Sequence, residues 1–293
     1  MHPTMINIFS LPIPSYGLML ALSFLLGIWI ATRRAKKMGL DPDAVADMSF
    51  YLIISSIVGS RLYYVILNFD EFRGNLLAII NPFHGGSLGI GGLVMFGGFI
   101  GAILAGFIFF KLKKLPFLPY ADACAPSVGI GVFLTRIGCF LNGCCYGTIA
   151  RIGSTFSVTY PQTSPASAAW HHQHSIGAHG LQPSQLYESA GGLVMALILF
   201  WVGTKKPFTG LQFYLTIIMY SVLRFFVELT RYYSASEKIG PLTHNQVISI
   251  FFVLLGSALI LRHYLKKEND NQPDQNQTPE PAEEPVQAVT DKK

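Results

Sequence analysis

Charged residues are scarce in this chain, since Asp, Glu, Lys and Arg make up only 13% of its 293 residues. A soluble domain carries about 25%, so the composition excludes an ordinary soluble globular protein. The apolar and aromatic residues reach 51%, and the mean hydropathy is +0.42. The net charge of +5 is divided among short clusters between apolar runs. That distribution argues against a nucleic-acid surface and is typical of membrane topology.

Cysteine and N-terminal basic residues are also scarce. The four cysteines, Cys124, Cys139, Cys144 and Cys145, are too few for a disulfide scaffold. Residues 1–10 contain no Lys or Arg, and no small-residue cleavage site follows them. We therefore expect the first apolar run to be a retained span and not a cleaved signal peptide.

Long apolar runs are abundant, and a transmembrane helix needs about 20 such residues. The candidate spans are residues 12–32, 46–67, 88–110, 122–142, 186–204, 209–230 and 246–265. The sequence therefore predicts an all-α polytopic membrane protein with about seven transmembrane helices.

Basic residues gather in alternate connections, after the first, third, fifth and seventh runs. These clusters are Arg33, Arg34, Lys36 and Lys37; Lys111, Lys113 and Lys114; Lys205 and Lys206; and Arg262, Lys266 and Lys267. The positive-inside rule places the side rich in basic residues in the cytoplasm. We therefore expect the N-terminus outside and the C-terminus in the cytoplasm.

The chain should form one transmembrane domain over residues 1–265, with an outer loop over residues 143–185 and a disordered cytoplasmic tail over residues 266–293. The tail is rich in Gln, Pro, Glu and Asp and cannot bury a core. The loop is long for a simple connection, and long loops are often functional. Its histidines are His171, His172, His174 and His179. Their spacing follows no firm zinc pattern, so we favour a solvated loop.

Glycines recur along the third predicted span. They are Gly91, Gly92, Gly97, Gly98, Gly101 and Gly106. Small residues at a spacing of four allow helices to approach closely. We expect tight helix packing here; a lipid in the gap left by the absent side chains is the alternative.

Three arginines, Arg61, Arg136 and Arg224, lie inside predicted spans, where charge is costly and usually marks a site. Each is six residues from the outer end of its span, or about 9 Å below the boundary. That depth matches the phosphate and glycerol of an outer-leaflet lipid, and Arg is suited to bidentate phosphate contact. The alternative is ion pairing, for which Glu188 and Glu228 are the nearest candidates. For Arg61 the two interpretations are equally supported.

Several motifs occur in a characteristic order. They are YGLML at 16–20, GSRLYYVI at 59–66, LTRIGCFLNGCCYG at 134–147, PSQLYE at 183–188 and YSVLRFFVELTR at 220–231. In this order and spacing the chain resembles bacterial prolipoprotein diacylglyceryl transferases, from about Tyr16 to Ser249. Each motif alone is weak evidence, and the combination is strong.

The resemblance implies a multi-pass enzyme of the bacterial plasma (inner) membrane. Such enzymes move a diacylglyceryl group from phosphatidylglycerol to the lipobox cysteine of a preprolipoprotein, forming a thioether at the outer face. The expected partners are phosphatidylglycerol, preprolipoprotein signal peptides and membrane lipid, with no nucleic acid. The resemblance implies no cofactor and no metal.

The resemblance also suggests roles for individual residues. The expected catalytic residues are Arg136, Arg224, Glu188 and Tyr16. The expected substrate-binding residues are Arg136, Asn142, Gly147, Tyr220, Glu228 and Arg231, to which the depth argument adds Arg61. A weaker match includes Gln246 and Ser249.

Four positions depart from the family pattern. Phe96 and Gln182 replace histidines, and Cys139 and Cys144 replace an asparagine and a glutamate. The proton acceptor is therefore left open between Glu188 and Tyr16. For the cysteines we favour packing of small residues over a Cys139–Cys144 bridge, a thiol relay or a metal site.

Two other functions remain open. One is a family paralogue that performs thiol exchange through Cys139, Cys144 or Cys145. The other is a non-catalytic protein that binds or transports lipid. A transporter would more often show internal repeats, and the sequence has none that we detect.

Overall fold

The computed structural model describes most of the chain. The described residues are 4–8, 11–74, 79, 83–84, 87–88, 94–149, 157–160, 180–205, 208–231 and 238–270. Within them the long helices are α1 (Ser15–Lys37), α2 (Pro42–Leu67), α3 (Met95–Lys113), α4 (Phe117–Asn142), α6 (Ser184–Thr204), α7 (Leu211–Glu228) and α8 (His244–Asp270). All seven are long and apolar enough to cross a bilayer. The predicted all-α architecture with seven spans is therefore confirmed.

The helix ends differ from the apolar runs by a few residues. Helix α1 continues to Lys37 and α8 to Asp270, whereas the apolar runs end at residues 32 and 265. A helix can continue into polar residues, because its backbone hydrogen bonds do not depend on hydropathy. Hydropathy therefore locates the membrane-spanning part of each helix but not the ends of the helix.

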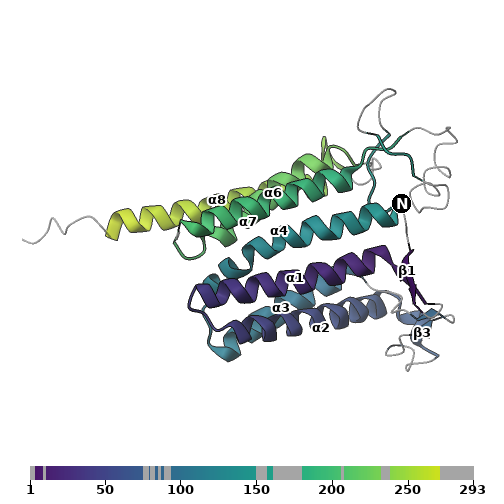
Figure 1. Cartoon of the computed structure of the whole chain (residues 1–293), viewed down its shortest axis with the longest axis horizontal. Helices are drawn as coiled ribbons and strands as arrows, with labels where there is room; N and C mark the ends of the chain where they lie inside the picture. The colour runs from purple at the N-terminus through teal and green to yellow at the C-terminus, as the bar shows by residue number, and fades with distance from the viewer. Residues whose placement is uncertain are drawn as a thin grey trace, which may run out of the picture.

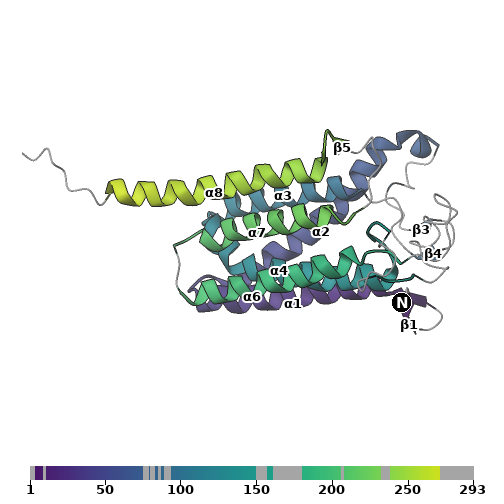
Figure 2. The ribbon, with the colours of Figure 1, turned by 90° about the horizontal axis from the view of Figure 1, so that it is seen from above.

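Short elements connect the helices. They are the antiparallel pairs β1 (Thr4–Ile8) with β2 (Leu11–Pro14), β3 (Phe83–His84) with β4 (Ser87–Leu88), and β5 (Lys238–Ile239) with β6 (Leu242–Thr243), and the 3-10 helix η1 (Phe69–Phe72). They lie toward the end of the bundle opposite the C-terminus of α8 (Figures 1 and 2). The sequence does not predict these hairpins, since none carries a long alternating pattern.

Helix α4 is central to the bundle. It packs against α1 on one side and against α6 and α7 on the other, while α2 pairs with α3 and α7 with α8. In Figure 1, α1, α2 and α3 lie on one side of α4, and α6, α7 and α8 lie on the other. Residues carried by α4 can therefore contact both halves of the protein.

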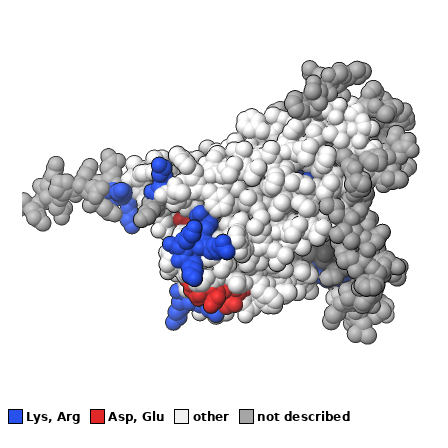
Figure 3. Space-filling view, in the orientation of Figure 1, with Lys and Arg blue, Asp and Glu red and all other residues white. Residues whose placement is uncertain are grey.

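The outer surface of the bundle is apolar. Exposed side chains include Leu25, Ile66, Phe107, Trp201 and Leu254, from five different helices. On the face shown in Figure 3, basic side chains gather at one end, and the broad middle is almost free of charge. Such a surface suits the hydrocarbon interior of a membrane.

Helices α2 and α3 approach closely at glycines. A Cβ atom at Gly59 would meet the backbone of Gly97 and Gly101, and one at Gly101 would meet the carbonyl of Ser55. The expectation of tight helix packing along the glycine-rich span is therefore confirmed at these positions.

We expect Gly101→Ala to destabilise the protein by about 1–3 kcal/mol, because the added methyl group forces α2 and α3 apart. Gly106→Ala is the matched control on the same helix, since its Cβ would meet only Leu52 at an ordinary 3.5 Å. Gly106→Ala should be neutral or stabilising by about 0.5–1 kcal/mol. Thermal unfolding in detergent measures both, and equal unfolding midpoints would contradict the packing explanation.

At the basic end of the bundle, Asp122 of α4 holds the start of α7. Its carboxylate accepts hydrogen bonds from the backbone N–H of Gly210 at 2.5 Å and of Phe213 at 2.8 Å. Arg34 of α1 donates to the side chain of Gln212 at 2.7 Å and to the backbone carbonyl of Ala123 at 3.1 Å. Arg34, which belongs to the basic cluster after the first span, therefore also links α1 to α4 and α7.

Asp122→Ala should destabilise the fold by about 1–3 kcal/mol, because it leaves two backbone N–H groups at the start of α7 without their acceptor. The matched control is Asp47→Ala, since Asp47 makes an exposed ion pair with Lys113 at 3.6 Å. An exposed pair of this kind contributes at most about 1 kcal/mol. Thermal unfolding of the two variants decides the point, and a smaller loss in Asp122→Ala than in Asp47→Ala would refute it.

Candidate active site

The last two turns of α4 carry three residues of the candidate site, Arg136, Cys139 and Asn142. The helix ends because Gly143 adopts a left-handed conformation (φ 73°) and its N–H donates to the carbonyls of Cys139 and Phe140. Glycine adopts this conformation without steric cost. Cys144 and Cys145 follow directly after this turn.

Glu188 joins the two central arginines. The carboxylate lies at the start of α6 and is 2% exposed. Its Oε1 lies 2.8 Å from Nη2 of Arg136 on α4, and its Oε2 lies 3.3 Å from Nη1 of Arg224 on α7. Arg136 and Arg224, which the sequence places at equal depth, therefore meet on one carboxylate.

Glu228 completes the second half of this network. Its Oε2 lies 3.1 Å from Nη2 of Arg224, one helical turn away on α7. Its Oε1 accepts hydrogen bonds from Nδ2 of Asn245 at 2.7 Å and from the hydroxyl of Thr243 at 3.3 Å. Glu228 is an ion-pair candidate in the sequence, and the structure pairs it with Arg224.

A cavity of about 910 Å³ opens beside this network. Its polar wall holds Tyr16, Arg136, Asn142, Glu188 and Tyr220, together with Cys139, Cys144 and Cys145. The rest of the wall is mainly apolar and continues along α1 past Leu20, Phe24 and Ile28 to Ala31. The cavity is therefore amphipathic, with a charged head and a long apolar body.

Other predicted residues lie outside this cavity wall. Arg61 donates from Nε to the carbonyl of Ile79 at 3.0 Å and lies over the rings of Tyr64 and Phe72. Gly147 packs where a Cβ atom would meet the Ser184 hydroxyl and the carbonyls of Thr230 and Gln182. Both positions thus have a structural explanation, and their roles in substrate binding stay predictions.

The weaker matches in α8 also have structural partners. Gln246 accepts a hydrogen bond from the backbone N–H of Thr243 at 3.0 Å, and the Ser249 hydroxyl donates to the Asn245 carbonyl at 2.8 Å. They support the segment that positions Glu228. Phe96, at a position where the family often has histidine, is largely exposed near the start of α3.

Gln185 is a buried positioning residue that the sequence analysis did not single out. Its Nε2 donates to the carbonyl of Cys144 at 2.8 Å, and its Oε1 accepts from the Tyr160 hydroxyl at 3.1 Å. Burial raises the pKa of Tyr160 to about 12, so this hydroxyl keeps its proton and remains a donor. The sequence offered one indication of its role, because Gln185 lies within the PSQLYE motif that also contains Glu188.

The cysteines after α4 are free thiols. A Cys139–Cys144 bridge is not formed; instead the Cys144 thiol contacts the carbonyl of Cys139 at 3.7 Å. The pKa of Cys145 is lowered by the neighbouring Cys139 and Cys144 thiols and by the charges of Arg231 and Arg136. The loop histidines, His171, His172, His174 and His179, lie outside the described residues.

The fold and this site define a class of protein: a polytopic membrane protein with an arginine–carboxylate network at the head of an amphipathic cavity. The chain belongs to the prolipoprotein diacylglyceryl transferase family, whose sequence model matches residues 3–262. The resemblance inferred from the motifs is thus confirmed.

Curated relatives agree over most of the chain. A phosphatidylglycerol–prolipoprotein diacylglyceryl transferase of Clostridium novyi is 32% identical over 269 residues, which is 92% of this chain and 98% of the relative. Relatives with the same name from Clostridium tetani and Listeria welshimeri are 33% and 30% identical. The alignments cover 87% and 91% of this chain, and 95% and 91% of those proteins.

Proposed function

We propose that this protein transfers a diacylglyceryl group from phosphatidylglycerol to the lipobox cysteine of a preprolipoprotein. The observation that carries the proposal is the meeting of Arg136 and Arg224 on Glu188 at the polar head of the cavity. The names of the relatives state the same reaction for those proteins.

The shape of the cavity suits a lipid donor. Its wall runs along α1 from Tyr16 to Ala31, a rise of about 22 Å at 1.5 Å per residue. One leaflet contributes about 15 Å of hydrocarbon, so the apolar body is long enough for acyl chains. The polar head then lies at the level of the glycerol and phosphate.

The charges of the head suit a phosphodiester. Arg136 and Arg224 are paired with Glu188 and Glu228, and the charge of Arg231 acts on neighbouring Cys145. Arg136, Arg224 and Arg231 with Glu188 and Glu228 leave one positive charge in excess, and of these groups Arg136 and Glu188 line the cavity itself. A phosphodiester carries one negative charge, and a guanidinium group can hold it through two parallel hydrogen bonds.

In the reaction, the thiolate of the acceptor cysteine attacks the glycerol carbon that bears the phosphate ester. A carbon–sulfur bond forms, the carbon–oxygen bond breaks, and glycerol phosphate leaves with the electron pair. Arg136 lies in the cavity wall, so it offsets the charge that develops on the leaving group. Arg224 lies behind Glu188 and orients it, while Glu228 holds Arg224.

Glu188 and Tyr16 are the candidates to accept the thiol proton. Both oxygens of Glu188 are engaged by arginines in this structure. When Arg136 turns toward the lipid phosphate, Oε1 of Glu188 is released and can take the proton. Donor binding thus prepares the base, and Tyr16, which also lines the cavity, orients the acceptor thiol.

The protein should work at the outer face of the bacterial plasma membrane, with its N-terminus outside. The basic residues in the last turns of α1, α3 and α8 support this orientation, since they lie at the end opposite the charged cavity head (Figure 1). The cavity head then faces the leaflet where an exported signal peptide emerges. The same orientation places the residues after α8 in the cytoplasm.

The test uses the purified chain in vesicles that contain phosphatidylglycerol labelled in its acyl chains, with a lipobox peptide as acceptor. We expect a thioether-linked product and one glycerol phosphate released for each peptide modified. A peptide with serine in place of the lipobox cysteine, and vesicles of phosphatidylcholine alone, are the controls. Lipid binding without transfer would support the non-catalytic alternative, and disulfide exchange with the peptide would support the thiol-exchange paralogue.

A further inference from the structure

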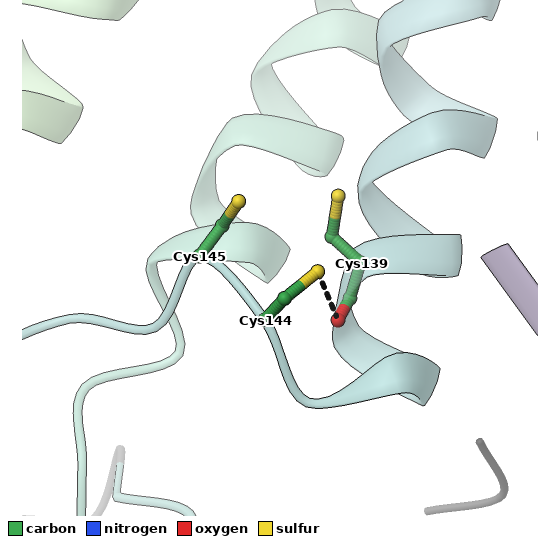
Figure 4. A group of neighbouring side chains, drawn as sticks. All are labelled: Cys139, Cys144 and Cys145. Atoms are coloured by element: carbon green, nitrogen blue, oxygen red, sulfur yellow. Dashed lines mark hydrogen bonds between the residues drawn. The ribbon is translucent and has the colours of Figure 1, made fainter. Parts of the chain in front are cut away.

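Three thiols that the proposed reaction does not use lie together in the cavity wall. The Sγ atoms of Cys139, Cys144 and Cys145 are all within 4.8 Å of one another. Cys139 is buried at the end of α4, and the other two are half-buried in the turn that follows. Figure 4 shows the three side chains converging from the last turn of α4 and the segment after it.

The spacing of the sulfurs suits a shared ion better than a disulfide. A metal ion bound to three sulfurs at about 2.3 Å each holds them about 4 Å apart. A disulfide needs a sulfur–sulfur distance of about 2.05 Å, and all three cysteines are free. A small inward movement of the side chains would therefore give three-coordinate geometry.

The backbone holds this arrangement in place. Cys145 has a positive φ of 61° although it is not a glycine, and such residues are uncommon and often functional. The carbonyl of Cys144 is held by the buried Gln185 at 2.8 Å, and the N–H of Gly147 donates to the Gln182 carbonyl at 3.0 Å. The turn therefore presents its two thiols to Cys139 from a fixed backbone.

A neighbouring cation suits thiolate ligands. Nη1 of Arg136 lies 3.9 Å from Sγ of Cys139. Three thiolates and a divalent ion together carry one negative charge, which a guanidinium group can offset. Thiolates are soft ligands that select soft cations over Mg²⁺ or Ca²⁺.

We propose that Cys139, Cys144 and Cys145 form a binding site for a soft, thiophilic d¹⁰ cation such as Zn²⁺ or Cd²⁺. Binding forms three metal–sulfur bonds and releases three thiol protons to solvent. The three cysteines line the cavity, so the remaining coordination position faces the space that the substrates enter.

An occupied site should lower transfer activity, and this consequence rests on the proposed function. The anionic metal–thiolate group attracts Arg136, which then holds the lipid phosphate less well. Binding of the ion itself does not depend on transfer, so the two can fail separately.

The binding test uses the reduced, metal-free, purified protein and Cd²⁺ alone as the probe. We expect an ultraviolet thiolate-to-metal charge-transfer band that saturates at one ion per chain. Cys139→Ala and Cys145→Ser each remove a direct ligand and should weaken Cd²⁺ binding at least about tenfold. Loss of a residue that only contacts a ligand already weakens metal binding by about that factor. Cys124→Ala is the matched control, because Cys124 is a free cysteine of α4 in the same cavity wall but outside the cluster.

Each outcome bears on the proposal. Absence of the band, unchanged affinity in both cluster variants, or loss of binding in Cys124→Ala would overturn the site. Retained thermal unfolding midpoints in the variants exclude misfolding as the cause of any loss. Inhibition of transfer by one equivalent of Cd²⁺, relieved in Cys145→Ser, supports the regulatory consequence, and unchanged transfer with the ion bound rejects it. A protein without transfer activity would refute the proposed function and leave the binding result valid.

Discussion

Arg136→Lys should lower kcat/KM for diacylglyceryl transfer by about 10²–10³, the loss seen when one donor to a developing negative charge is removed. Lysine keeps the charge but loses the planar fork that contacts an anion through two nitrogens. In this structure Nη2 of Arg136 contacts Glu188, and the fork is what lets Arg136 exchange that carboxylate for two oxygens of the lipid phosphate. The measurement is the initial rate of peptide modification in phosphatidylglycerol vesicles over a range of lipid fractions.

The control for this variant is Arg73→Lys. Arg73 makes an exposed ion pair with Asp70 at 3.1 Å and is 73% exposed, so its replacement should leave the rate unchanged. If Arg136→Lys retained the wild-type rate while lipid binding was also unchanged, Arg136 would have no part in the chemistry. The assignment of the cavity head would then have to move to other residues.

Glu188→Gln should destabilise the fold and abolish most activity. The substitution leaves Arg136 and Arg224 without their shared carboxylate, and breaking a buried ion pair costs about 3–5 kcal/mol. The lost charge also removes the candidate proton acceptor. Thermal unfolding in detergent should therefore show a lower midpoint than wild type.

Added phosphatidylglycerol tests whether the two arginines bind the lipid headgroup. With Glu188 neutralised, a lipid phosphate can take the place of the missing charge between the arginines. Phosphatidylglycerol should therefore raise the unfolding midpoint of Glu188→Gln more than that of wild type, and phosphatidylcholine should not. The control is Glu71→Gln, since Glu71 is exposed and accepts one hydrogen bond from Tyr64 at 3.1 Å. Equal responses of the two variants to phosphatidylglycerol would show that the arginines do not bind the headgroup.

Much of the arrangement follows from local sequence. Each span is recognisable because a helix of about 20 apolar residues is long enough to cross the hydrocarbon core of a membrane. Counting residues from the span ends also placed Arg136 and Arg224 at one depth, and the ion pairs to Glu188 bear this out. Depth is readable because a helix rises by a constant amount per residue.

The partners of those residues were harder to infer. Glu188 and Glu228 are ion-pair candidates in the sequence, but nothing in the sequence assigns both arginines to Glu188. Such an assignment needs the rotation of α4, α6 and α7 about their axes, which depends on how their side chains pack together. For the same reason Gln185 and Asn245 escaped notice, although both hold residues of the site.

Arg61 shows the limit of the depth argument. It lies in a span at the expected level, yet its guanidinium group contacts the carbonyl of Ile79 and two aromatic rings of its own region. Helix α2 packs mainly against α3, so depth alone did not bring Arg61 to the network on Glu188. Equal depth is necessary for a shared site and does not establish one.

Hydropathy, charge distribution and motif order were enough to infer the number of spans, the expected orientation and the family, because each depends on neighbours along the chain and on the membrane as solvent. The three-dimensional packing alone determined which carboxylate pairs with which arginine, that the cavity runs from Tyr16 to Ala31, and that three thiols converge beside Arg136. These features join residues from different helices, and their contact depends on helix rotation and on one left-handed turn at Gly143. Neighbouring residues in the sequence do not determine how far each helix is rotated about its axis or which side chains the turn brings together.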